Sequence, residues 1–115
     1  MPDPPRQADG TGALDDTAYP GYAMGAAAGA IEVTPAFLRA AETAGLFDVH
    51  RSNGGHRRYS RDDLRRAERA RQLLNEGIRM DAAARIVSLE YQLAAAHAMI
   101  NLLRNTAGPD RVREE

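Results

Sequence analysis

Arginine side chains gather around a glycine turn near the middle of the sequence. The stretch SNGGHRRYSRDDLRR, residues 52–66, contains this turn, one tyrosine and five arginines. Residues 50–71 hold eight arginines against three acidic residues, although the formal net charge of the whole chain is −1. Guanidinium groups donate paired hydrogen bonds to phosphates and to guanine edges. The basic region therefore predicts contact with a nucleic acid.

The Asn-Gly-Gly turn at 53–55 predicts how these arginines are presented. Its glycines accept the positive φ that tight hairpins demand, so 48–52 and 56–60 are predicted to form a small two-stranded wing. Alternate side chains of a strand point to opposite sides, so Arg57 is expected to lie over the domain with Tyr59, a core anchor, unless strand twist lets both wing arginines reach phosphate. The predicted DNA contacts of the wing are Arg51, His56, Arg57, Arg58 and Tyr59.

Two short helices are predicted before the wing. Residues 25–31 can form the first, and Thr34-Pro35 is a good start for the second, at about 35–44, which Gly45 ends. Such a pair with a short joint is a helix-turn-helix pattern, whose second helix enters a major groove with its first turns. An arginine there can read guanine or grip phosphate, whereas the phenylalanine can equally belong to the core. The predicted contacts of this helix are Thr34, Ala36, Phe37 and Arg39.

Two further helices are predicted after the wing. Ser60 caps the first, with Asp63 three residues later in a relative of the capping box, and Gly77 closes it. The last segment, 81–105, has Asp81 as its predicted cap and the Gly-Pro pair that follows as its stop, and it can be one helix or two. Its apolar residues alternate at spacings of three and four, which is a heptad seam. The seam consists of Ile86, Leu89, Leu93, Ala96, Ile100 and Leu103.

This seam is predicted to pair with its twin in a homodimer, because the other helices look too small to cover it. Packing of the seam on its own domain is the alternative. The chain of 115 residues has room for one compact domain with tails. We predict an acidic disordered tail over 1–20, a DNA-binding domain over 21–80, a dimerisation helix over 81–105 and a flexible tail over 106–115.

Several function classes are not indicated. The chain has no cysteine, which excludes disulfides and thiolate metal sites and is compatible with a reducing cytoplasm. His50, His56 and His97 lack metal-like spacing, and no phosphate loop or nucleophile motif is present, so we expect no enzyme, metal or cofactor. No uninterrupted apolar run approaches the roughly 18 residues of a membrane helix. We expect no membrane partner and a cytoplasmic, nucleoid-associated location.

The order of these elements resembles the MerR family of bacterial transcription regulators, over about residues 22–104. The family patterns Y-x-I-G-E-L-A, V-S-x-x-T-I-R-Y-Y-E-x-x-G-L and G-Y-R-x-Y-x-x-x-D-L correspond here to YAMGAAA, VTPAFLRAAETAGL and GHRRYSRDDL. GGHRRYS is also similar to the wings of small excisionases. NEGIRMDAAARIVSLEYQL looks like the helices after the wing in the heat-shock repressor branch.

The resemblance implies roles for particular residues. Arg39 would be the family arginine of the recognition helix, and Arg57 and Tyr59 the wing residues that approach phosphates. Both tyrosines of the family pattern are replaced by alanine, at positions 40 and 41, and Phe37 is expected to refill the lost volume. Glu32 stands where the turn commonly has glycine.

We therefore predict a mainly α fold, a winged helix-turn-helix with a small β-hairpin wing and a C-terminal helix that dimerises as an antiparallel coiled coil. The predicted function is a homodimeric regulator that binds double-stranded DNA sequence-specifically and represses, with room for a protein co-regulator. Two alternatives stay open. One is an architectural or excisionase-like protein that bends DNA; the other is an interaction module whose basic face meets an acidic protein.

Overall fold

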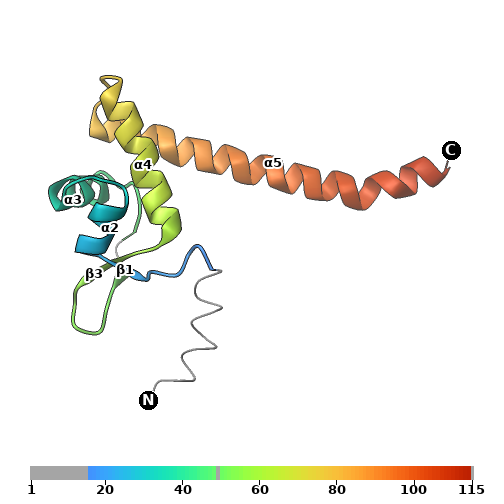
Figure 1. Ribbon diagram of the computed structural model, residues 1–115. Coiled ribbons are helices and arrows are strands. Elements are labelled where there is room, and N and C mark those ends of the chain that lie inside the picture. The colour runs from blue at the N-terminus through green and yellow to red at the C-terminus, as the bar shows by residue number, and fades with distance from the viewer. Residues whose placement is uncertain (1–15, 49, 115) are drawn as a thin grey trace, which may run out of the picture.

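The computed structural model describes residues 16–48 and 50–114. Figure 1 shows a helix pair and a small sheet gathered beside one helix, while the last helix projects from them as a long rod. This mainly α architecture confirms the predicted fold class. The elements in chain order are β1 (Tyr22–Ala23), α2 (Met24–Ala30), α3 (Pro35–Thr43), β2 (His50–Arg51), β3 (Arg57–Tyr59), α4 (Arg61–Asn75) and α5 (Met80–Glu114).

The pair α2–α3 is the helix-turn-helix, and its joint is tight. Glu32 adopts a φ of 58°, in the left-handed region that usually favours glycine. The turn therefore forms without the family's glycine, at the cost of backbone strain at this residue. Thr34 caps α3 as predicted, because its Oγ1 accepts a hydrogen bond of 3.0 Å from the backbone N–H of Phe37, and Pro35 occupies the first turn.

The three strands form one antiparallel sheet in the order β1-β3-β2. Tyr22 lies opposite Tyr59, and His50 lies opposite Arg58. The sequence pattern predicts only the two wing strands, with longer ranges; β1 is an addition, because two residues carry no alternation signal and depend on β3 for pairing. Val49, in the predicted first wing strand, lies outside the described residues, as does most of the predicted tail over 1–20.

The capping box at the start of α4 is present in full. Ser60 Oγ accepts from the Asp63 backbone N–H at 3.0 Å, and Asp63 Oδ2 accepts from the Ser60 backbone N–H at 2.9 Å. Both residues are buried. The segment before β1 also reaches this helix start, since Thr17 Oγ1 donates to Asp62 Oδ2 at 3.1 Å. The N-terminus of α4 is thus fixed from two sides.

The core is built mainly from small side chains. Several alanines are fully buried, among them Ala27, Ala41, Ala67 and Ala83, and such small side chains let the helices approach closely. Larger anchors fill the centre, where the rings of Phe47 and Tyr59 meet edge to face with centroids 5.7 Å apart. The remaining buried apolar residues are Ala28, Ile31, Leu38, Leu46, Leu64, Ala70, Leu73, Ala84 and Val87.

Helix α5 is a single helix that begins at Met80, so Asp81 lies in its first turn and is not the cap that the sequence predicts. An acidic side chain there is favourable beside the helix N-terminus. The helix also continues beyond the predicted stop at Gly108 and Pro109, since a proline can kink a helix without ending it. The predicted division at 105–106 therefore falls inside α5.

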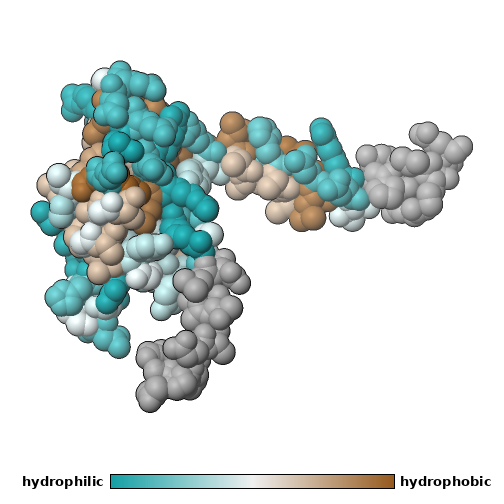
Figure 2. All heavy atoms as spheres, in the orientation of Figure 1, coloured by the Kyte–Doolittle hydropathy of each residue, from teal (hydrophilic) through white to brown (hydrophobic). Residues whose placement is uncertain are grey.

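Only the first part of α5 packs on the rest of the fold. Arg69 of α4 forms a bidentate ion pair with Glu90, with Nη2 and Oε2 2.9 Å apart, and the guanidinium of Arg66 lies 4.5 Å above the ring centre of Tyr91. From Gln92 to Thr106 the side chains are exposed, and Figure 2 shows apolar surface recurring along the projecting helix.

The stretch Met80–Thr106 is long and apolar enough, by length and composition alone, to cross a membrane. This finding differs from the sequence expectation. The sequence contains no uninterrupted apolar run of that length, because residues such as Glu90, His97 and Asn101 break every run, whereas the average over the helix is apolar.

Candidate nucleic-acid interface

Helix α3 presents one face outward and one to the core. Leu38 and Ala41 are buried, whereas Thr34, Ala36 and Arg39 are exposed. The fourth predicted residue of this helix, Phe37, is partly buried against the core cluster. The structure thus leaves three of the four predicted residues of this helix free to meet a ligand. Phe37 contacts the core, as the alternative interpretation of that residue holds.

A hollow of about 520 Å³ lies between α3, the start of α2 and the wing. Its lining brings together residues from three elements that are distant in the sequence. The apolar side is formed around Ala23 and Met24. The basic residues that line it are Arg39, Arg51, His56, Arg57 and Arg58. Five of the nine predicted DNA-contacting residues therefore face one concave surface, which we call the basic hollow.

Arg57 is the most constrained of these arginines. It lies on β3 beside Tyr59, and its Nε donates a hydrogen bond of 2.8 Å to Oε1 of Glu42 on α3. The two side chains are 31% and 13% exposed, so the pair is largely shielded from water. The inward direction of Arg57 agrees with the alternation predicted for the strand.

The wing tip is held by local hydrogen bonds. The backbone N–H of Ser52 donates to the carbonyl of His56 at 2.8 Å, and Gly55, with a φ of +85°, completes the turn. Arg51 Nη1 donates to the carbonyl of Gly55 at 2.8 Å. Arg51 and His56 are exposed, so the tip offers cationic and polar groups on a braced loop.

Tyr59 is a core anchor, with 2% of its surface exposed. Its hydroxyl donates to the sulfur of Met24 over 3.7 Å. Burial raises the pKa of Tyr59, and the nearby carboxylate of Glu42 raises it further, while Arg57 and Arg39 lower it. The phenol therefore stays neutral at physiological pH. Tyr59 and Glu42 interact electrostatically with Arg57 and Arg39, which line the basic hollow.

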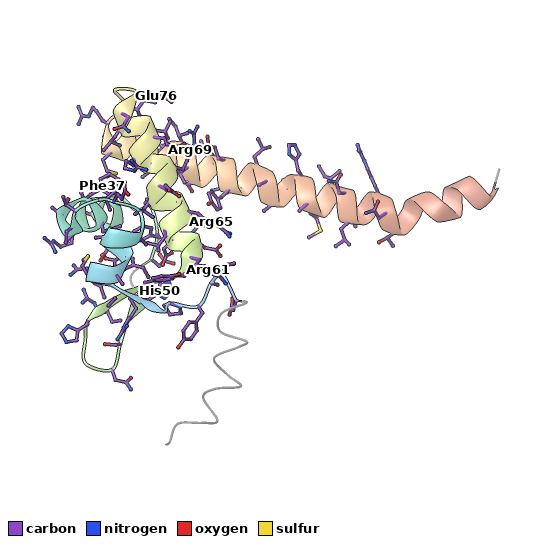
Figure 3. The ribbon with its side chains drawn as sticks, viewed as in Figure 1. Phe37, His50, Arg61, Arg65, Arg69 and Glu76 are labelled. Atoms are coloured by element: carbon purple, nitrogen blue, oxygen red, sulfur yellow. The ribbon has the colours of Figure 1, made fainter. Side chains whose placement is uncertain are left out.

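The arginines of residues 50–71 divide into two groups. The wing arginines form part of the lining of the basic hollow. In contrast, Arg61, Arg65 and Arg69 lie along α4, away from Phe37 on α3 (Figure 3). Arg69 pairs with Glu90, and Arg65 lies 3.6 Å from Asp62. The run of basic residues in the sequence is therefore not one surface, and part of it attaches α4 to α5.

A second hollow, of about 460 Å³, lies between the end of α3 and the start of α5. It is lined by Ala40, Thr43 and Ala44 of the α3 segment and by Arg79, Met80 and Asp81 at the start of α5. Ala40 is one of the positions where the family pattern carries tyrosine, and the small side chain leaves this space open. Arg79 follows no pattern in the sequence. Glu42 matches the glutamate of the family pattern V-S-x-x-T-I-R-Y-Y-E, but its contact with Arg57 joins distant segments and cannot be read from the sequence.

Metal binding finds no support in the geometry. Within the part of the chain that the structure describes, no group of three or more His, Asp or Glu side chains is placed to hold a metal ion. His50 instead approaches the capping carboxylate of Asp63, with Nε2 and Oδ2 3.8 Å apart.

A helix-turn-helix with an exposed basic residue on its second helix, flanked by an arginine-rich wing, defines a DNA-binding protein. The family comparison agrees: the model of the MerR HTH family regulatory protein matches residues 22–90, from β1 into α5. The chain belongs to the MerR family of helix-turn-helix regulators. It is a DNA-binding transcription regulator that works inside the cell, and not an enzyme. A comparison with curated proteins gives no match.

Proposed function

We propose that this regulator acts as a homodimer that recognises a specific operator and represses transcription. The observation that carries the proposal is the basic hollow, where Arg39 of α3 and the wing arginines face the same side of the fold. In this arrangement α3 enters the major groove and the wing lies along the phosphate backbone. DNA binding is assigned to residues 21–80 and dimerisation to residues 81–105.

The exposed face of α3 supports sequence reading. Arg39 is the only arginine of this helix, and Thr34 and Ala36 lie beside its first turn with their side chains exposed. Arginine forms paired hydrogen bonds with guanine, and small side chains leave space for the methyl group of thymine. We assign base reading to Arg39 and backbone contact to the wing residues Arg51, His56 and Arg58, of which Arg58 is partly buried.

The apolar seam of α5 supports the homodimer. Leu89 and Leu93 are each 57% exposed, Ile100 is 44% exposed and Leu103 is 60% exposed, and with Ile86 and Ala96 they follow the heptad spacing. Residues of this size are rarely left in water as a continuous stripe. An antiparallel pair of α5 helices would cover the stripe and hold two α3 helices at a fixed separation.

The polar residues of α5 favour a second copy over a membrane. Glu90, His97 and Asn101 interrupt its apolar residues, and a bilayer surrounds a helix on all sides. A charged residue at the centre of a bilayer-spanning helix costs about 2.5–3.5 kcal/mol. A paired helix leaves these groups in water, and we therefore place the protein in the cytoplasm, on the nucleoid.

Repression is the finer part of the proposal, and it is supported by the likeness of residues 75–93 to the heat-shock repressor branch. A dimer that covers two half-sites would block a promoter by occupying it. By the same likeness, a protein co-regulator would bind at one of the chain's tails.

The experiment is a selection of bound DNA. The full chain is mixed with fragmented genomic DNA at about 150 mM salt, where non-specific contacts are weakened, and the retained fragments are sequenced. We expect an inverted repeat with half-sites about one or two helical turns apart. Retention without a common motif would favour an architectural DNA-bending protein. Absence of retention would contradict the proposal and direct attention to a protein partner.

A further inference from the structure

Glu42 is an acidic residue on the helix that is assigned to read DNA. Its carboxylate is repelled by phosphates, so its presence beside the basic hollow weakens attraction to any duplex. The same carboxylate holds Arg57 Nε at 2.8 Å. The repulsion between this carboxylate and DNA must therefore be offset by what the contact with Arg57 contributes to binding.

The Glu42–Arg57 pair is the link between the recognition helix and the wing. Among the residues that the structure describes, it is the one side-chain hydrogen bond or ion pair that joins α3 to β2 or β3. It connects positions 15 residues apart in the sequence. A hydrogen bond between two planar groups fixes the direction of a side chain more strictly than apolar packing does.

The geometry of Arg57 leaves its other donors available. The contact with Glu42 uses Nε, and the terminal Nη groups make no hydrogen bond within the described residues. Arg57 also lines the basic hollow. A guanidinium held at one edge by a carboxylate presents its remaining N–H groups in a fixed direction. These groups form a planar fork that matches the geometry of a phosphate.

We propose that Glu42 is a positioning residue for specificity: it fixes Arg57, and through it the wing, in the register with α3 that fits one operator geometry. The proposal rests on the DNA-binding function proposed above. Without the carboxylate, Arg57 can follow phosphates in many registers. Binding to arbitrary duplexes then stays equal or rises, while binding to the selected operator falls.

The test compares two probes on the full-length chain. One probe is a pool of random-sequence duplexes, and the other is the duplex that the wild-type protein enriches most from that pool. We expect Glu42→Gln to lower the ratio of operator affinity to pool affinity about tenfold. Arg57→Lys, which keeps the charge but lacks Nε, should lower the ratio similarly, so the result does not depend on one variant.

Two further measurements separate positioning from simpler roles. In an Arg57→Ala background, Glu42→Gln should leave the ratio unchanged, because the two residues act through one contact. In the free protein, the Nε–H resonance of Arg57 should show slow exchange with water and lose this protection in Glu42→Gln. Glu68→Gln, which removes an exposed acid on α4, is the matched control and should change both affinities equally. Melting curves verify folding of each variant.

An equal rise in both affinities for Glu42→Gln would overturn the proposal, since it would show repulsion only. A ratio unchanged from the wild-type value would overturn it as well. In both cases the wild-type protein still selects a sequence, so the proposed function stands. A wild-type chain that enriches no duplex would instead overturn the proposed function, and this inference with it.

Discussion

The burial of apolar residues differs between two regions of the molecule. We call the part from β1 to Tyr91 the head and residues 92–106 of α5 the rod. In the head, alanines such as Ala41 and Ala67 are fully buried and the helices close around Tyr59 and Leu38. In the rod, Leu93 and Leu103 are more than half exposed. The difference teaches that the head completes its own core, whereas the rod leaves its apolar side chains uncovered, which supports the proposed pairing with a second copy.

The largest expected effect is on the rod. Replacing Leu93 with glutamate places a charge in the seam of each helix, and burying an unpaired charge is strongly unfavourable. We expect the dissociation constant of the homodimer to rise at least about a hundredfold, measured by sedimentation equilibrium. Ala94→Glu, one residue further and about 100° around the helix, is the control and should leave the dimer intact. Equal dissociation in both variants, or a wild-type monomer, would contradict the assigned seam.

In the head, Phe37→Ala should lower the free energy of unfolding by about 2 kcal/mol, because the ring packs on the core in place of a family tyrosine. Phe37→Leu, which keeps most of the apolar volume, should lose less. Thermal melting measures both. An unchanged melting temperature for Phe37→Ala would refute the compensation.

The tight turn of the head offers a stabilising change. Glu32 has a positive φ, so Glu32→Gly should relieve strain and raise stability by up to about 1 kcal/mol. Ala30→Gly, two residues earlier in α2, is the matched control and should destabilise, because glycine weakens a helix. If both changes destabilise alike, the left-handed turn is not a source of strain.

The smallest effect concerns the joint between head and rod. The hydrogen bond from Arg69, followed by its charge, lowers the pKa of Glu90. A lowered folded-state pKa means that the pair stabilises the protein above the unfolded-state value and that this contribution is lost as pH falls through the folded-state value. The wild-type melting temperature should therefore fall more than that of Glu90→Gln in mild acid. Parallel curves would show that the pair contributes nothing.

Local signals predicted much of this molecule. The caps at Thr34 and Ser60 depend on residues three positions away, and a sequence displays such spacings directly. The heptad spacing of apolar residues in α5 is likewise visible in the sequence, and Leu89, Leu93, Ile100 and Leu103 are exposed in the structure. The contact of these seam residues with a second copy stays a prediction.

Long-range contacts explain what the sequence did not predict. Strand β1 exists because β3 lies beside Tyr22, and the Glu42–Arg57 pair requires that a helix and a hairpin meet. The two residues of β1 give no alternation signal, and the family patterns contain the glutamate and the arginine without showing that their side chains meet. For the same reason, the eight arginines of residues 50–71 look like one basic surface in the sequence. Only the fold separates the wing arginines from those, such as Arg69, that hold α5.

The most direct test of the central claim compares the sequence preferences of two full-length variants. Selection from random duplexes is performed for wild type, Arg39→Ala and Arg57→Ala, with affinities measured over a range of salt. We expect Arg39→Ala to change which bases are preferred. Arg57→Ala should keep the preferred bases, weaken binding to all duplexes and most to the operator, and lower the logarithmic salt slope by about 0.9. Identical sequence profiles for the two variants would contradict the division between a reading helix and a gripping wing.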